Sequence, residues 1–377
     1  MAISEINDKS LAASAVNLAT NTVTGVLPAA NTVANLSPGN NIVINGAMQV
    51  AQRSTSVAIS SDGYHTLDRW RTAISSLGSW TQTKSTDVPT GAGFASSLKM
   101  DCTTADASPA AGDYLQVSTR IEGQDVQRLK YGTASAESMI LSFWVKSTKT
   151  GVNVVSFYQD DGAKQISGSY TIGTSNTWEY KTIAFVGNTV NAIANDNTRG
   201  FQVAWYLGAG SNRTSGTLRT AWTAYATADE AVGQVNNADS TSNDWLITGV
   251  QLEVGTVATP FNHRSYGQEL QLCKRYFQKI GNRVGICSGS TTITAIGPYP
   301  VSLRAAPTVG QTGVLNAQNG SNRNVTQSST GLGTNYGTNE SMFQVAIPNF
   351  TGLTAPEAIN ISTPANNNNL FTLDAEL

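Results

Sequence analysis

Carboxylate pairs are the first residues to test for chemistry, and the most prominent pair in this chain is Asp160 and Asp161. Adjacent residues on a strand face opposite sides of the sheet. The two catalytic carboxylates of a glycosidase must instead flank one sugar, about 5 to 9.5 Å apart. Together with Gly162 the two aspartates are typical of a hairpin turn. A structural calcium ion at one of them is an open alternative.

Metal-binding and nucleophile motifs are missing from the sequence. It contains no HExxH, CxxC, GxxxxGK[ST] or GxSxG motif, and its two histidines, His65 and His263, lie far apart. Three scattered cysteines are too few for a disulfide framework, so we expect them to be reduced and buried. We therefore predict a protein without catalytic residues, cofactor or metal site.

Aromatic side chains are the better candidates for a binding site. Four tryptophans, at positions 144, 178, 205 and 245, lie inside strand-like segments and are expected mostly in the core. Trp80, Trp222 and Tyr225 lie in more polar surroundings. Exposed rings at these three positions could stack on sugars, which makes them the candidate carbohydrate-binding residues. Packing into the core is the alternative that the sequence leaves open.

The elements that must position these rings are mostly strands. From residue 41 to residue 254, segments rich in β-branched and aromatic residues recur with turns between them, beginning with a predicted strand over 41–53. No segment with a helical period intervenes. The pattern predicts a mainly β fold with an antiparallel jelly-roll or β-sandwich body over residues 41–264.

One long helix is predicted at about residues 265–280. Ser265 is a candidate N-cap with Gln268 at the capping-box position, and Gly281 is placed to end the helix. A single apolar stripe follows the helical spacing: Tyr266, Leu270, Cys273, Phe277 and Ile280. The stripe could face the sandwich or two further copies of the chain. We treat residues 265–281 as a linking helix that packs on something, because a helix this short is marginal alone.

The two ends of the chain have different compositions. Residues 282–377 return to strand patterns and are predicted to form a smaller C-terminal β domain. Residues 1–40 contain no aromatic residue and carry Pro28 and Pro38 among small polar residues. They cannot bury a core of their own. They are either a disordered leader or an arm that docks on a partner, and we favour the arm.

Overall composition excludes several classes of protein. The chain has 377 residues, only 13% of them charged, and a net charge of −2 without any basic cluster, so no nucleic-acid partner is expected. No apolar run approaches the roughly 20 residues that span a bilayer. Glu5, Asp8 and Lys9 stand where a signal peptide would be apolar. We expect synthesis in a cytoplasm without a signal peptide.

The segment VQLEVGTVATPFNHRSYGQELQLCKRYFQKIG, residues 250–281, closely resembles a signature of tail-fibre-like virion proteins of tailed bacteriophages. LSFWVKSTKTG, NTWEYKTIAFVG and YPVSLRAAPTV are similar to further parts of that group, so the resemblance spans about residues 41–310. Asn262 departs from the acidic residue expected there. The resemblance implies a carbohydrate-binding-module-like sandwich and offers no catalytic residue to carry over.

The same resemblance implies a role. The chain is expected to be a structural protein of a phage virion, a fibre or appendage component that takes part in assembly and in recognition of a host-surface glycan. It would be a homotrimer attached to other tail or capsid proteins through residues 1–40, with the polar loop from Asn316 to Glu340 facing the host. A head fibre or capsid-decorating protein is the alternative, and a polysaccharide depolymerase is the less favoured one.

Overall fold

A computed structural model describes residues 41–318, 324–333, 338–362 and 370–377. The predicted docking arm, residues 1–40, lies outside the described residues. The described chain is mainly β and its named strand pairs are antiparallel, which confirms the predicted fold class. No helix in the described ranges is long and apolar enough to cross a membrane.

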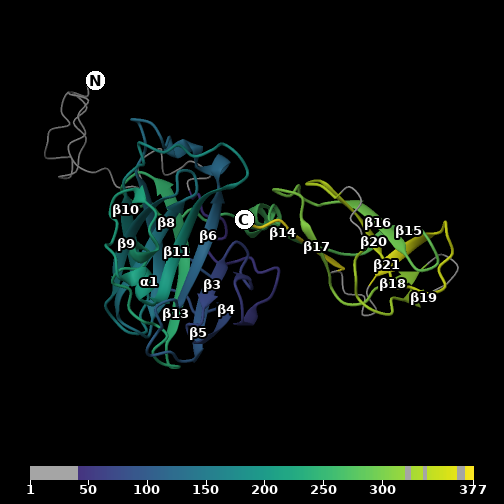
Figure 1. The fold of residues 1–377 in the computed structure, drawn as a ribbon, viewed down its shortest axis with the longest axis horizontal. Coiled ribbons are helices and arrows are strands. Elements are labelled where there is room, and N and C mark those ends of the chain that lie inside the picture. Colours follow the sequence, from purple (N-terminus) through teal and green to yellow (C-terminus); the bar gives the residue numbers. More distant parts are fainter. Residues whose placement is uncertain (1–40, 319–323, 334–337, 363–369) are drawn as a thin grey trace, which may run out of the picture.

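Two sheets pack face to face to form the sandwich (Figure 1). The first has the strand order β1 (Ser56–Ile59), β4 (Ser79–Ser85), β5 (Ser97–Thr104), β13 (Asp244–Val254), β7 (Met139–Ser147), β10 (Glu179–Phe185). The second has the order β12 (Thr223–Ala224), β9 (Lys164–Ile172), β8 (Gly151–Gln159), β11 (Arg199–Ala209), β6 (Tyr114–Glu122), β3 (Arg71–Ser75), β2 (Gly63–Tyr64).

Alternating side chains explain why these segments form a sandwich. In β7, Leu141, Phe143 and Val145 are fully buried and join the core between the sheets, whereas Trp144 points outward. Phe143 meets Trp205 of the opposite sheet edge to face, with ring centroids 5.7 Å apart. Each such aromatic residue contributes about 1.5–3 kcal/mol by its burial. The chain crosses repeatedly between the two sheets, as in a jelly roll.

The predicted first strand over residues 41–53 is wrong. The segment forms turns, and Asn45 and Met48 have positive φ angles of 59° and 57°. Asn45 organises these turns, because its side-chain amide donates to the Val50 and Asp68 carbonyls while its oxygen accepts from the Val50 amide. Apolar residues in this segment are therefore buried without joining a sheet.

The helix begins as predicted but is shorter. Helix α2 spans Tyr266–Lys274, with Ser265 as its N-cap in a complete capping box. The apolar stripe does not continue along one helix, because Phe277 and Ile280 lie in strand β14 (Phe277–Ile280). β14 pairs with a strand close to residue 377, a distant partner that the local period could not reveal. The predicted helix from 275 to 280 is therefore wrong.

The residues of the predicted apolar stripe differ in how far they are buried. Cys273, Phe277 and Ile280 are buried, Leu270 is half-buried, and Tyr266 is 56% exposed. Leu272, on another side of the helix, is 36% exposed. The helix therefore packs through Cys273 and leaves Tyr266 at the surface.

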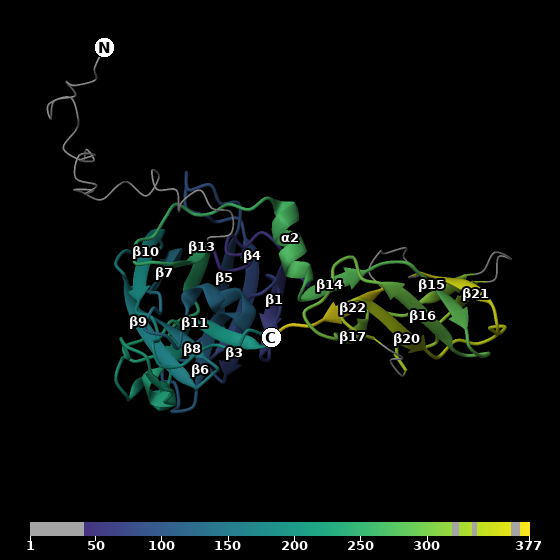
Figure 2. The same cartoon turned by 90° about the horizontal axis from the view of Figure 1, so that it is seen from above.

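Beyond the helix lie two smaller sheets (Figure 2). They enclose a second hydrophobic core around Phe343 and Phe371. One sheet has the order β14, β22 (Phe371–Asp374), β17 (Thr308–Gln311). The other has the order β19 (Asn324–Thr326), β18 (Asn316–Gln318), β21 (Ala358–Ser362), β15 (Arg283–Cys287), β16 (Ile293–Pro298), β20 (Met342–Ile347). We call these the C-terminal sheets.

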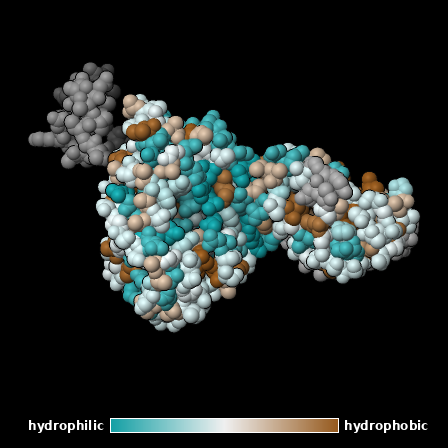
Figure 3. All heavy atoms as spheres, in the orientation of Figure 1, coloured by the Kyte–Doolittle hydropathy of each residue, from teal (hydrophilic) through white to brown (hydrophobic). Residues whose placement is uncertain are grey.

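Short helices complete the sandwich. The 3₁₀ helix η3 (Gly123–Leu129) follows β6, and a segment containing α1 (Ser211–Thr214) and η4 (Thr227–Asp229) covers part of the seven-stranded sheet. This segment is held by ion pairs, one of them between Arg219 and Asp229 at 2.6 Å. The face of the molecule in Figure 3 is mostly hydrophilic with scattered hydrophobic spots.

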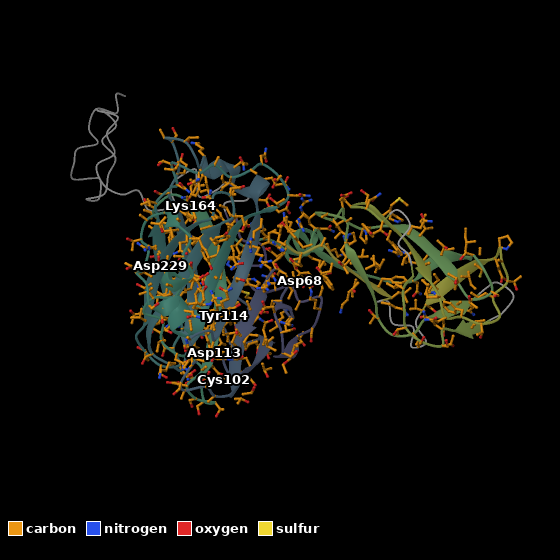
Figure 4. The ribbon with its side chains drawn as sticks, in the orientation of Figure 1. Asp68, Cys102, Asp113, Tyr114, Lys164 and Asp229 are labelled. Carbon is orange, nitrogen blue, oxygen red and sulfur yellow. The ribbon has the colours of Figure 1, made fainter. Side chains whose placement is uncertain are left out.

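Ion pairs fix the C-terminal sheets to the sandwich. Arg275, just after α2, donates two bonds of 2.8 Å to Glu122, whose side chain is fully buried at the end of β6. Arg53 pairs with Asp374 at 3.0 Å, and the buried Arg69 pairs with Glu376. Figure 4 places Asp68 on the side of the sandwich that faces this junction. The two parts are therefore joined by several side chains as well as by the helix.

Candidate functional site

Trp80, one of the candidate carbohydrate-binding residues, lies in the core. Its side chain is 1% exposed, and its indole N–H donates to the Leu77 carbonyl at 2.8 Å. The polar neighbours that favoured exposure are the outward-facing residues of the same alternating strand, such as Thr81. The prediction that Trp80 offers a ring to sugars is therefore wrong.

Trp222 and Tyr225 lie on the segment that covers the seven-stranded sheet. Trp222 is half-buried, stacks on Phe201 with centroids 5.8 Å apart, and donates from its indole N–H to the Val186 carbonyl. Tyr225 keeps 38% of its surface exposed, and its hydroxyl contacts Glu230 at 3.0 Å. Of the three candidates, Tyr225 is exposed, Trp222 is partly covered and Trp80 is buried.

A larger group of aromatic side chains, some of them partly exposed, lies on the outer face of the six-stranded sheet of the sandwich. It lines an open cavity of about 610 Å³, within the usual size range for ligand sites. We call this cavity the aromatic cleft. Its walls are Ala92, Phe94, Ser142, Trp144, Tyr180, Gly249, Ala258, Thr259, Pro260, Phe261 and His263.

The floor of the aromatic cleft is a cross-strand pair. Trp144 of β7 lies directly opposite Tyr180 of β10, and their ring centroids are 5.3 Å apart. Trp144 is half-buried and Tyr180 is 45% exposed, so both side chains are partly open to solvent. The outward direction of Trp144 follows from strand alternation, although we expected most tryptophans in strands to be core residues.

One wall of the cleft is a loop held from beneath by two buried polar residues of β13. Gln251, which is fully buried, accepts from the Asn262 amide at 2.7 Å and donates to the Thr259 carbonyl at 3.3 Å. Glu253, 3% exposed, accepts from the Thr259 amide at 3.0 Å. The backbone of the Thr259–Asn262 turn is thus fixed at both ends, which places Phe261 over the cleft.

Phe94 lines the cleft next to this loop and packs on a glycine. Gly249 has a φ of +62°, and a Cβ atom there would lie 2.6 Å from the Phe94 ring. The Phe94 and Phe261 rings meet edge to face at 5.0 Å. His263 lies 5.2 Å from Phe94, and burial lowers its pKa, so the imidazole is neutral at pH 7. The cleft is therefore aromatic and uncharged.

Polar side chains lie beside the cleft on the same face of the sheet. Asp87 accepts from the Lys146 ammonium at 2.7 Å and from the Trp178 indole N–H at 2.9 Å. Burial raises the pKa of Asp87, but these two hydrogen bonds outweigh it and hold the pKa below its ordinary value. We call Asp87, Lys146 and Trp178 the polar row.

The adjacent carboxylates Asp160 and Asp161 both have structural partners. Asp160 forms a salt bridge with Arg199, and Asp161 accepts from the Ala194 amide at 2.9 Å. Both lie in the predicted hairpin between β8 and β9, which the structure confirms. In the described ranges, no group of three or more His, Cys, Asp or Glu side chains could hold a metal ion.

Comparison with known proteins gives distant likenesses only. No protein family and no curated protein matches the chain. The enzymatically active domain of bacteriophage CBA120 tailspike protein 4 is 15% identical, over 58% of this chain and 22% of that one, with a TM-score of 0.32. The chain therefore spans less than a quarter of that structure.

Two carbohydrate-binding modules are similarly distant. TmCBM61, solved with β-1,4-galactotriose, is 10% identical, over 57% of this chain and 99% of that one, with a TM-score of 0.29. A family 4 module is 13% identical, over 56% and 98%, with a TM-score of 0.28. Likenesses this distant say nothing about function. The sandwich is assigned from the strand order of this chain.

Proposed function

We propose that this protein binds a glycan in the aromatic cleft. The observation that carries the proposal is the pair Trp144 and Tyr180, two partly exposed rings that lie side by side on neighbouring strands of one sheet. The C–H face of a sugar ring is apolar and suits such rings, while its hydroxyls need polar groups at the edge. The cleft supplies the rings, and the polar row beside it supplies hydrogen-bonding groups.

The interaction would be binding without bond cleavage. The cleft is lined by aromatic and small side chains and by a neutral histidine, with no carboxylate among its walls. A single cleft of this kind binds weakly, and several copies on one assembly would strengthen attachment.

The test is the affinity of the purified chain for surface polysaccharide from the host bacterium, measured by calorimetry. Trp144→Ala is expected to weaken binding about tenfold or more, because the central aromatic residue of an interface contributes more than about 1 kcal/mol. Tyr225→Ala is the matched control, since it removes an exposed ring on the other sheet. Loss of binding in the control alone would move the site to the seven-stranded sheet.

We further propose that the protein is a fibre or appendage component of a phage virion. The resemblance of residues 250–281 to tail-fibre-like proteins supports this role, and so does the low charge content of the chain. On this proposal residues 1–40 dock on other virion proteins. The loop from Asn316 to Glu340, part of which lies outside the described residues, would be a second host contact.

A homotrimer is part of the same proposal. Exposed Tyr266 and Leu272 on α2 offer apolar surface for contact between copies. Light scattering on residues 41–377 is expected to give three times the mass of the chain. A monodisperse monomer would contradict the trimer for this fragment and assign the helix to the sandwich alone.

A further inference from the structure

The polar row lies next to the aromatic cleft, because Lys146 shares strand β7 with Trp144 and holds Asp87 beside it. Lys146 is two residues beyond Trp144 on β7, so both point outward and lie about 7 Å apart along the strand. Trp178 precedes Tyr180 by two residues in the neighbouring segment. The cleft and the polar row are therefore adjacent positions on one continuous face.

Two side chains of the polar row, Asp87 and Lys146, can form further hydrogen bonds. Asp87 has a side chain 43% exposed, and each of its oxygens has one protein partner. A carboxylate offers about four acceptor sites, so it can accept further bonds from hydroxyl groups. The Lys146 side chain, 15% exposed, is held against Asp87 and has two more protons to donate.

Charges around the polar row are already paired. Lys146 is neutralised by Asp87, and Lys99 on the next strand but one lies 3.0 Å from Asp244 and 3.8 Å from Asp101. An anionic ligand would find both ammonium groups engaged and three carboxylates close by. A neutral ligand rich in hydroxyls meets no such repulsion.

The geometry points to two neighbouring subsites for one neutral glycan chain: Trp144 and Tyr180 stack one sugar, and Asp87 and Lys146 hydrogen-bond the hydroxyls of the next. Lys146 lies about 7 Å along β7 from Trp144, which is longer than one sugar unit, so a ligand that reaches both positions has at least two units. This inference deepens the proposed function and rests on it. It makes the ligand a segment of a polysaccharide rather than a single terminal sugar.

The experiment measures binding to an array of neutral and uronate-containing oligosaccharides, from monosaccharides to hexasaccharides. The unmodified protein is expected to bind neutral disaccharides and longer chains, and to bind monosaccharides at least about tenfold more weakly. Asp87→Asn, which keeps the size of the side chain, is expected to reduce binding of the longer chains about tenfold and to leave monosaccharide binding unchanged.

Three variants separate the contributions. Trp144→Ala is expected to weaken binding of every probe about tenfold or more, and Lys146→Met is expected to behave as Asp87→Asn does. Lys130→Met is the matched control, because it breaks an exposed lysine–carboxylate pair on another part of the surface. Thermal melting identifies any variant that fails to fold. If a polar-row variant fails to fold, Trp178→Phe, which removes one donor to Asp87, replaces that variant.

Several outcomes would overturn the inference while the proposed function stands. These are equal affinity for monosaccharides and longer chains, tighter binding of uronate-containing probes, and folded polar-row variants with the affinity of the unmodified protein. Failure of the unmodified protein to bind any glycan, on the array or on the host surface, would reject the proposed function and the two subsites with it.

Discussion

Gly249 shows how a residue without a side chain shapes the aromatic cleft. Its positive φ breaks the regular pleat at a bulge in β13, and its bare Cα leaves room for the Phe94 ring. The sequence shows a glycine inside a strand pattern, which is a common sign of a close approach. It does not show which ring approaches, because Phe94 lies on a distant segment.

Gly249→Ala is expected to destabilise the sandwich by about 2 kcal/mol and to weaken glycan binding, since both the φ angle and the space oppose a Cβ atom. Calorimetric melting and binding assays on the same sample measure the two effects. Gly91→Ala is the matched control, because Gly91 has a similar φ of +76° with nothing within 4 Å of its added Cβ. Equal effects of the two substitutions would mean that the contact with Phe94 contributes neither to the loss of stability nor to the loss of glycan binding.

Glu122 makes the stability of the junction depend on pH. Burial raises its pKa, but hydrogen bonds from Arg275 and Tyr276 outweigh this and hold the pKa below 4.5, the ordinary value. A carboxyl with a lowered folded pKa stabilises the protein above its unfolded pKa. That contribution is lost as the pH falls from about 4.5 through the folded pKa.

Glu122→Gln is therefore expected to lower the free energy of unfolding by about 2 kcal/mol at pH 7, because Arg275 loses its buried partner. Below the folded pKa the difference from the unmodified protein is expected to shrink, since Glu122 is then protonated too. Urea unfolding at pH 7 and at pH 3 measures the free energy of unfolding of the variant and of the unmodified protein. A difference that stays constant between the two pH values would contradict the assignment.

Secondary-structure elements were predicted best where their signals were local. The strands of the sandwich follow alternation, and the start of α2 follows its capping box, so both could be predicted from the sequence. The end of α2 could not, because β14 exists through pairing with β22 almost a hundred residues later. The turns around Asn45 were missed for a related reason, since its side chain bonds to the distant Asp68 carbonyl.

The candidate site was predictable only in part. Sandwich architecture and the outward direction of Trp144 follow from the strand pattern. The meeting of Phe94, Trp144 and Phe261 depends on loops whose backbones are set by Gln251 and Gly249. Polar surroundings in the sequence identified Tyr225 as exposed but misplaced Trp80, because a strand alternates between environments at every residue.

Helix α2 provides a test at the scale of one element. Ser265→Ala removes the side chain that accepts from the Gln268 amide and is expected to cost about 1 kcal/mol of stability. Ser265→Asp is the matched control, because aspartate is an equally good N-cap residue. Thermal melting should rank the aspartate variant with the unmodified protein. Equal melting of all three would show that packing alone fixes the start of the helix.

At the scale of the whole molecule, the sandwich and the C-terminal sheets have separate cores and a polar junction. The cores contain, for example, Trp205 on one side and Phe343 on the other. Between them, the pairs Arg275–Glu122 and Arg53–Asp374 hold the two parts in one orientation. We therefore expect one elongated body in solution rather than two independently tumbling domains.

Deletion of residues 1–40 tests the proposal that the arm attaches the protein to the virion while the folded body binds the glycan. The shortened protein is expected to melt at the temperature of the full chain and to keep its glycan affinity, because the aromatic cleft lies between residues 92 and 263. It is also expected to be absent from purified particles. Particles that carry the shortened protein at normal copy number would place the virion anchor elsewhere in the chain.

The pairing of β14 with β22 has a consequence for how such a protein can diversify. The chain leaves the junction at Ile280 and returns beside it at Phe371, as a direct pair in the same sheet. The segment between these two residues therefore leaves and rejoins the same sheet, and within it β17 also pairs with β22 and Arg304 bonds to Asn197 of the sandwich. Recombination that exchanged residues 281–370 would leave in place β14, β22 and three ion pairs of the junction, while the new segment would have to supply counterparts of β17 and Arg304. The C-terminal sheets could then be altered by exchange of one continuous segment of sequence.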